Sequence, residues 1–152
     1  MQLRHYTQSL LVAAILAAPY AVQAQAPALK WGPAPAVFPK GASMAVLQGD
    51  PSKSELFTVR LDMPDGYRIP PHFHPTDEHV TVISGTFKVG MGDAFDAKQM
   101  MTLPAGGFVT AGANMHHYAQ AKGHTVVQVH AMGPFQLTYV NAADDPTRKS
   151  KP

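Results

Sequence analysis

The chain has 152 residues, a formal net charge of +2 and no cysteine. Its length favours one domain, and the lack of cysteine excludes disulfides, thiolate nucleophiles and cysteine-ligated metals. The near-neutral charge, with no long basic run, argues against a nucleic-acid partner.

The N-terminal segment, residues 1–24, has the three-part layout of a secretory signal peptide. A short stretch with one arginine precedes an apolar run at 10–22, and small residues follow at Val22-Gln23-Ala24. The 13 residues of that run fall short of the roughly 20 that span a bilayer as a helix. We expect cleavage after Ala24, no membrane anchor after cleavage, and a periplasmic or secreted mature protein.

Residues 25–41 form a Pro/Ala-rich arm, in which four prolines exclude a regular helix. We expect the arm to be extended and to pack on the next domain through Trp31 and Phe38. At the other end of the chain, residues 141–152 are predicted to form a polar tail.

From residue 42 to residue 140 the hydrophobic period is two, as in strands with one buried face. The alternation is clearest at 57–63, 86–91 and 135–140. The positions predicted to be buried in these segments are Phe57, Val59, Leu61, Met63, Phe87, Val89, Met91, Phe135, Leu137 and Tyr139. Turn signals, among them Ser84-Gly85 and Gly123, separate the strands. Many short strands without helical stretches indicate an all-β sandwich or closed barrel, and the length suits a single jelly-roll domain.

Residues with metal-binding chemistry are concentrated between Gly66 and Gly85. His72 and His74 are two positions apart and face the same way on a strand, and Glu78 has the same parity. Two imidazoles and a carboxylate are costly to bury without partners, and a divalent cation would supply the missing partner. The spacing therefore predicts a metal site inside the barrel.

Residues 66–85 resemble the first motif of the cupin superfamily, G-x5-H-x-H-x3-E-x6-G, at every fixed position. The second cupin motif, G-x5-P-x-G-x2-H-x3-N, is matched in spacing from Gly106 to His117. Here Gly112, Asn114 and Ala121 replace its Pro, second Gly and Asn.

The resemblance covers roughly residues 42–140 and is to a small single-domain bacterial cupin. It implies a double-stranded β-helix, that is, a jelly-roll barrel. It also implies one metal site built from three histidines and one glutamate, which are His72, His74, Glu78 and His117.

Two adjacent histidines compete for the last ligand position. Because neighbouring strand residues face opposite ways, only one of His116 and His117 can point inside. An inward His117 places Ala119 inside and Tyr118 outside, whereas an inward His116 would bury Lys122 at high cost. We therefore predict His117 as the ligand, with His116 facing outward, where it is available for an oligomer contact such as that of a homodimer.

Three neutral imidazoles and one carboxylate suit Fe, Mn, Ni, Cu, Co or Zn and do not distinguish among them. The site charge of about +1 favours anionic or enolate-forming ligands. We predict a metal-dependent oxidoreductase of the dioxygenase type that acts on a small organic substrate. The alternative is a non-catalytic cupin that binds metal or a small ligand, since no catalytic residue beyond the metal ligands is identified.

Other polar and soft side chains are assigned lesser roles. His79 is expected to face away from the metal, and His124 to be solvated in a turn. His130 either lines the cavity or is a hydrogen-bonded structural residue. The methionines at 91, 100 and 101 are expected in the core or an interface.

Overall fold

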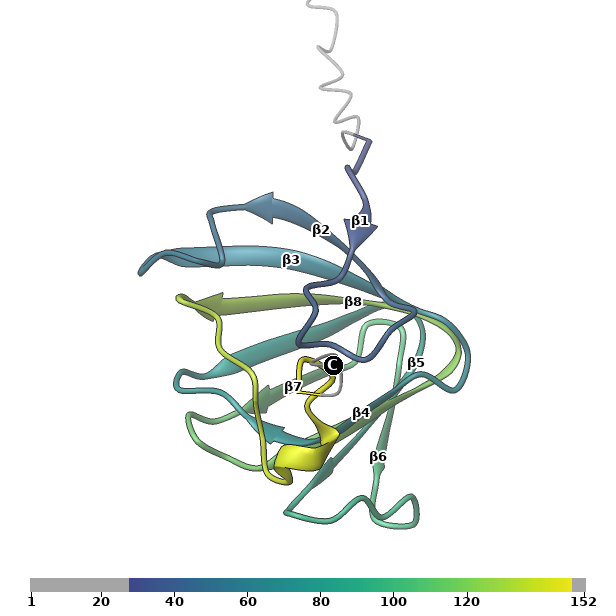
Figure 1. Ribbon diagram of the computed structural model, residues 1–152. Coiled ribbons are helices and arrows are strands. Elements are labelled where there is room, and N and C mark those ends of the chain that lie inside the picture. The colour runs from purple at the N-terminus through teal and green to yellow at the C-terminus, as the bar shows by residue number, and fades with distance from the viewer. Residues whose placement is uncertain (1–27, 149–152) are drawn as a thin grey trace, which may run out of the picture.

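The computed structural model describes residues 28–148, and Figure 1 shows that they form a curled, almost purely β structure. The strands are β1 (Gly32–Pro33), β2 (Ser43–Gln48), β3 (Leu56–Met63), β4 (Arg68–Phe73), β5 (Glu78–Met91), β6 (Met101–Pro104), β7 (Phe108–Ala111), β8 (His117–Met132) and β9 (Thr138–Tyr139). A short 3-10 helix, η1 (Ala142–Asp144), follows β9, and no α-helix occurs among the described residues. The all-β prediction is confirmed.

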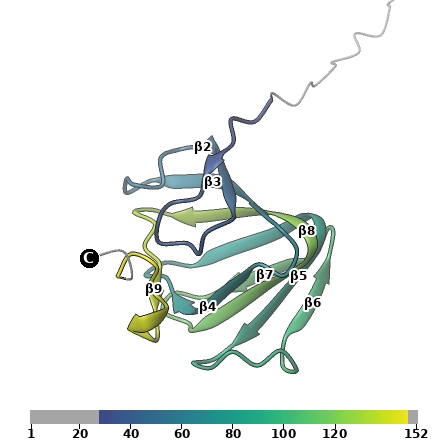
Figure 2. The same ribbon diagram turned by 45° about the vertical axis from the view of Figure 1, so that its right-hand side comes forward.

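Two long strands, β5 and β8, pair antiparallel along most of their length and join the two layers of the barrel. The C-terminal part of β8 pairs with β3 and its N-terminal part pairs with β4. Likewise β7 pairs with the start of β5, and β6 with its later residues. One layer is therefore β1-β2-β3-β8-β5-β7 and the other is β9-β4-β8-β5-β6. Figures 1 and 2 show these layers facing each other and meeting where β5 and β8 bend, which is the predicted jelly-roll barrel.

The turns predicted at Ser84-Gly85 and at Gly123 are wrong, because both glycines lie inside continuous strands. The pairing of β5 with β8 shifts register on both sides of Ser84. Gly85 has a φ of 77°, and a Cβ there would lie 2.3 Å from the backbone oxygen of His124. The glycine thus permits the irregularity through which β5 passes from one layer to the other.

The inward faces of the strands form the core largely as the alternation predicts. The four predicted positions of β3 are all buried, namely Phe57, Val59, Leu61 and Met63. Met91 is an exception, because it ends β5 and is 44% exposed. The strand predicted at 135–140 is confined to β9, and the Phe135 N–H donates instead to the Pro51 carbonyl in a loop, at 2.6 Å. Phe135 and Leu137 nevertheless pack on the core from the connecting loop.

On the outer face of β8, Tyr118 points away from the core as predicted, yet it is only 1% exposed. The connection between β5 and β6 covers it. The ring of Phe95 lies 5.1 Å from the ring of Tyr118, whose hydroxyl donates to the backbone oxygen of Asp96 at 3.1 Å. Gly90 makes room for the ring, because a Cβ there would lie 2.3 Å from its Cζ.

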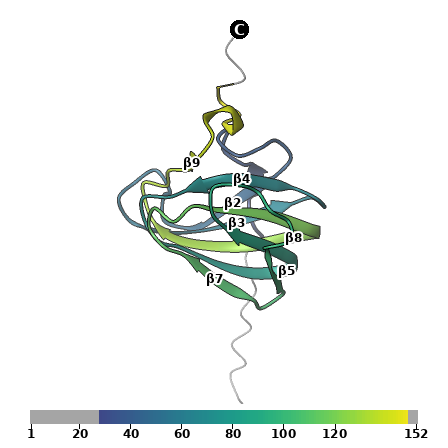
Figure 3. The same ribbon diagram turned by 90° about the horizontal axis from the view of Figure 1, so that it is seen from below.

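The arm before β2 lies against the barrel beside the C-terminal segment, as Figure 3 shows from below. Its residues Gly32 and Pro33 pair with the edge of β2. Phe38 is buried, as predicted, whereas Trp31, which directly precedes β1, is exposed. The predicted signal peptide, residues 1–24, lies outside the described residues. Within 28–148 no helix is long and apolar enough to cross a membrane.

Candidate metal centre

The four residues predicted from the two motifs come from both layers of the barrel. His72 lies on β4 and is paired with His117 at the start of β8. His74 follows β4 directly, and Glu78 is the first residue of β5 in the opposite layer. Glu78 therefore approaches the three histidines from across the core.

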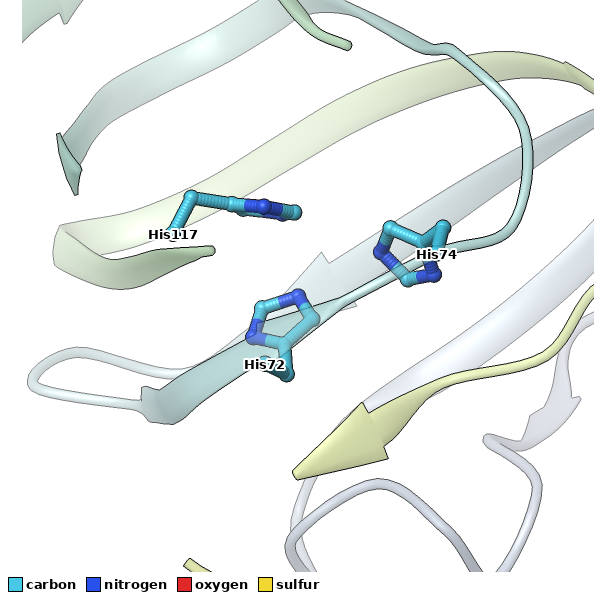
Figure 4. A group of neighbouring side chains, drawn as sticks. All are labelled: His72, His74 and His117. Atoms are coloured by element: carbon cyan, nitrogen blue, oxygen red, sulfur yellow. The ribbon is translucent and has the colours of Figure 1, made fainter. Parts of the chain in front are cut away.

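The three imidazoles converge. Among the described residues, the structure brings together one group of side chains able to hold a metal, His72, His74 and His117, whose ligand nitrogens all lie within 4.8 Å of one another. Figure 4 shows the three rings turned toward a common space. They are 3%, 2% and 3% exposed, respectively. The inward orientation predicted for His117 is thus confirmed, and its role as a metal ligand stays a prediction.

Each imidazole is held by its Nδ1 atom. The bond of His72 runs to the Pro70 carbonyl oxygen at 2.7 Å and that of His74 to the Gln136 carbonyl at 2.7 Å. For His117 the partner is the Met115 carbonyl at 2.9 Å. Because a carbonyl oxygen only accepts, each Nδ1 must carry the proton, and in the neutral ring the lone pair is then on Nε2. This is how proteins orient histidines that bind a metal through Nε2.

Two of these Nε2 atoms lack a hydrogen-bond partner among the described residues. The Nε2 atoms of His74 and His117 are buried and have no well-aligned hydrogen-bond partner within residues 28–148. Buried polar atoms are satisfied in the great majority of cases, so each exception requires an explanation. A cation bound at Nε2 explains both.

The carboxylate of Glu78 is buried beside the same atoms. Its Oε2 lies 3.3 Å from Nε2 of His117 and 3.6 Å from Nε2 of His74. Burial raises the pKa of Glu78, but the close approach of His117 and the charges of the histidines outweigh it and hold the pKa at about 2. Glu78 is therefore an anion at neutral pH. A cation bound by the Nε2 atoms of His74 and His117 would also be in reach of its carboxylate.

The histidines respond differently to this environment. Burial lowers the pKa of His72 to about 3, and the neighbouring His117 and His74 act in the same direction, so His72 is a neutral donor. Burial also lowers the pKa of His74. For His117, burial is outweighed by Glu78, and the pKa is raised. In the metal-free site, a proton on His117 therefore competes with a cation.

The space in front of these side chains is small and otherwise apolar. The cavity has a volume of about 30 Å³, and its walls combine the four motif residues with aliphatic and aromatic side chains from β2, β3, β4, β5, β7, β8 and the loops. Since a water molecule needs roughly 10–15 Å³ measured in this way, the cavity holds an ion with about one small ligand. The donor set, the burial and the space all fit a transition metal.

The second motif departs from the cupin pattern in sequence but keeps its structural role. Asn114 has a φ of 60°, and its backbone N–H donates to the His74 carbonyl at 2.7 Å. The neighbouring Ala113 N–H donates to Oδ1 of Asp77 at 2.7 Å. This loop thus ties the segment before His117 to the first motif, with Asn at the position that needs a left-handed backbone.

The remaining histidines lie away from the cavity. Nδ1 of His116 is 2.6 Å from Oδ1 of Asp93 on the surface. The outward side chain of His79 lies 3.0 Å from the Thr110 hydroxyl, as expected.

The contacts of His130 decide between its two predicted roles. Its Nδ1 lies 2.9 Å from the Thr58 hydroxyl, and its Nε2 lies 3.1 Å from the Gln128 amide, so His130 is the hydrogen-bonded structural residue and does not line the cavity. His124 is exposed as predicted, and its Nε2 lies 2.7 Å from Oδ1 of Asp62. Met101 is exposed, so it is not in the core, and a position in an interface stays a prediction.

Sequence reasoning missed the aromatic contact to His74. The ring of Phe135 stacks on the ring of His74 with centroids 4.7 Å apart, and the carbonyl that holds His74 belongs to the next residue, Gln136. Neither residue lies in a cupin motif, so only the fold reveals their contribution.

The comparisons with known proteins agree with this fold. The family model described as "Domain of unknown function (DUF4437)" matches residues 47–149, which is more than half of the chain. This chain belongs to the DUF4437 family of cupin-like domains. A search of curated proteins gave no match.

Solved structures similar to this DUF4437 protein include cupins, and the three described next have low sequence identity to it. A putative acetylacetone dioxygenase from Methylibium petroleiphilum PM1 has a TM-score of 0.59 at 22% identity, covering 90% of each chain. The polyketide cyclase RemF from Streptomyces resistomycificus has a TM-score of 0.57 at 16% identity, covering 73% of this chain and 80% of its own. An RmlC-like cupin from Shewanella frigidimarina NCIMB 400 has a TM-score of 0.55 at 16% identity, covering 70% and 86%. These similarities establish the fold of the DUF4437 protein.

Proposed function

We propose that His72, His74, Glu78 and His117 hold one divalent transition metal, and that this cupin uses it as a dioxygenase-type oxidoreductase acting on a small organic substrate. The main support is the pair of buried, unpartnered Nε2 atoms on His74 and His117. Leaving such a group unsatisfied costs about 1–3 kcal/mol. Coordination to a cation would remove this cost at both atoms.

The protein's own residues would set the electronic character of the site. A bound ion would serve as a Lewis acid and as a template for dioxygen or an oxygen-donor substrate. The backbone carbonyls that accept from Nδ1 keep the three imidazoles in one tautomer and orientation. Glu78 offsets one positive charge and leaves about one in excess, which favours an anionic or enolate-forming ligand.

The walls of the cavity support a small substrate with an apolar body. Besides the four polar residues, the lining side chains are aliphatic or aromatic. Such walls exclude bulk water from the reacting groups and strengthen the electrostatic interactions inside. The reaction therefore depends on the metal ligands, because the lining offers no further acid or base.

That same lining also favours a second candidate, a non-catalytic cupin that stores metal or captures a small ligand. Enzymes that move protons usually place a titratable side chain beside the substrate. In this cavity Glu78 and the three histidines are the only titratable groups among the described residues that line it. If all four ligate a metal, no separate proton donor remains in the cavity.

One experiment separates the two candidates. The purified protein is loaded with Fe(II), Mn(II) or Cu(II), and oxygen uptake and product formation are measured in air with small diketones and thiols. Turnover that is abolished in His117→Ala and retained in His116→Ala supports the oxidoreductase. A filled metal site without turnover on any of these classes supports the binding protein.

Export is part of the proposal. Its support is the sequence of residues 1–24 alone, which has the layout of a signal peptide. A protein without cysteine is also compatible with an oxidising compartment. We place the mature protein in the periplasm or outside the cell.

A further inference from the structure

Residues 34–42, the end of the arm and the first residue after it, form a strap that is held by hydrogen bonds on both sides of a single aromatic residue. The hydroxyl of Tyr139 donates to the Val37 carbonyl at 2.7 Å. The hydroxyl of Tyr67 donates to the Pro39 carbonyl at 2.5 Å. The residue between these two carbonyls is Phe38.

Both tyrosines are suited to hold the strap permanently. Their rings are buried, and burial raises the pKa of each phenol above its ordinary value. The hydroxyls therefore stay protonated and remain donors at any physiological pH. A further backbone bond, from Ala34 N–H to the Ala42 carbonyl at 3.0 Å, closes the strap on itself.

The held residue reaches the metal centre through a stack of rings. Phe38 lines the cavity. Its ring is stacked on Phe135 with centroids 6.4 Å apart and an interplanar angle of 13°. Phe135 in turn stacks on His74 at 4.7 Å and meets Phe57 edge-on at 5.3 Å. The strap thus extends an aromatic wall to one of the predicted ligands.

This wall differs from the rest of the lining. Most lining side chains stand on strands, whose positions are fixed by backbone ladders. Apart from His74, the described lining residues outside the strands are Phe38, Phe135 and Leu137. Of these, Phe38 is the one held through side-chain hydroxyl groups from other elements, so its position can be changed without breaking a strand.

We propose that Phe38, fixed by the Tyr67 and Tyr139 hydroxyls, sets the size limit for ligands of the metal centre. This proposal rests on the metal site proposed above. A cavity of about 30 Å³ admits ligands the size of dioxygen or azide and excludes an aromatic ring. An apolar cavity of roughly 150 Å³ is enough for benzene. Phe38→Ala removes one phenyl ring and leaves a ring-sized space beside the existing cavity.

The first test uses the metal-free protein, so that it does not depend on metal binding. Benzene binding is followed by NMR in the wild type, in Phe38→Ala and in the control Phe108→Ala, whose ring is 56% exposed and outside the lining. We expect binding only in Phe38→Ala. Benzene binding to the wild type, or none to a folded Phe38→Ala protein, overturns the proposal.

The second test uses the Cu(II)-loaded protein, with EPR spectra recorded during titration with azide or benzoate. Azide should perturb the spectrum of all three proteins alike. Benzoate should bind Phe38→Ala at least about tenfold more tightly than wild type or Phe108→Ala. Equal benzoate affinities in all three proteins contradict the size limit, whereas failure to load copper contradicts only the metal site.

The hydrogen bonds from the Tyr67 and Tyr139 hydroxyls are tested separately from the Phe38 ring. In the double variant Tyr67→Phe and Tyr139→Phe, Phe38 is intact but both carbonyls lose their donors. We expect this variant to gain benzene binding, more weakly than Phe38→Ala, and it replaces that variant if the latter does not fold. A double variant that excludes benzene as completely as the wild type shows that the hydroxyls do not position Phe38.

Discussion

The choice between the adjacent histidines gives a sharp prediction, because the structure places them in opposite environments. His117 is buried with an unpartnered Nε2 facing the cavity. His116 lies on the surface against Asp93 and stacks on Phe73 with centroids 5.0 Å apart. Replacing each by alanine deletes the same chemical group at neighbouring positions. We expect His117→Ala to lose tight metal binding and His116→Ala to keep it.

The size of the effect follows from the number of ligands. A structural zinc site with four ligands is worth roughly 10–16 kcal/mol, so one ligand accounts for about 3 kcal/mol, or about a hundredfold in affinity. At a free metal concentration about 100 times the wild-type Kd, binding stabilises the wild type by about 2.7 kcal/mol. A site about a hundredfold weaker gains only about 0.4 kcal/mol at the same concentration.

Thermal unfolding with and without metal measures this difference. For a domain of this length, metal should raise the Tm of the wild type and of His116→Ala by about 10 °C, and that of His117→Ala by about 2 °C. The metal-free Tm of each variant is the control for damage to the fold. Equal metal-induced shifts in the two variants, or loss of the shift in His116→Ala alone, would refute the assignment of His117.

Three further predictions concern other parts of the chain. Glu78→Gln should weaken metal binding strongly, seen as loss of metal on dialysis against a mild chelator, while its circular dichroism stays that of a β barrel; full metal retention would exclude Glu78 as a ligand. Pulse labelling in a Gram-negative host should show cleavage after Ala24, giving Gln25 as the mature start, and a cytoplasmic protein that keeps residues 1–24 would rule out export. Gly90→Ala should destabilise the fold by about 1–3 kcal/mol in urea unfolding, because its Cβ would overlap Tyr118, and unchanged stability would show that this ring yields easily.

Much of the fold and the candidate site could be predicted, because the information is local in sequence. The alternation in β3 identifies its buried face without reference to other strands. The parity of His72 and His74 predicts a shared face, and burial of Ala119 behind His117 agrees with the predicted register. For His117, the cost of burying Lys122 decided between two alternatives, and Lys122 is indeed exposed.

What could not be predicted depends on contacts between segments distant in sequence. Gly85 appears as a turn in the sequence, although it permits an irregularity inside β5, because only the pairing with β8 distinguishes the two. Tyr118 faces outward, but its burial depends on the connection that folds over it. The stack from Phe38 through Phe135 to His74 joins segments far apart in the chain, and no spacing rule connects them.

The central claim is that the three histidines and Glu78 form a metal site, and native metal content tests it most directly. The protein is expressed with its own N-terminal segment, purified from the periplasm without a metal-affinity step, and analysed by inductively coupled plasma mass spectrometry beside His117→Ala. We predict one transition-metal ion per chain in the wild type and a small fraction of that in the variant. A folded wild-type protein that holds no transition metal, and takes up none when Fe, Mn, Ni, Cu, Co or Zn is added, would contradict the claim.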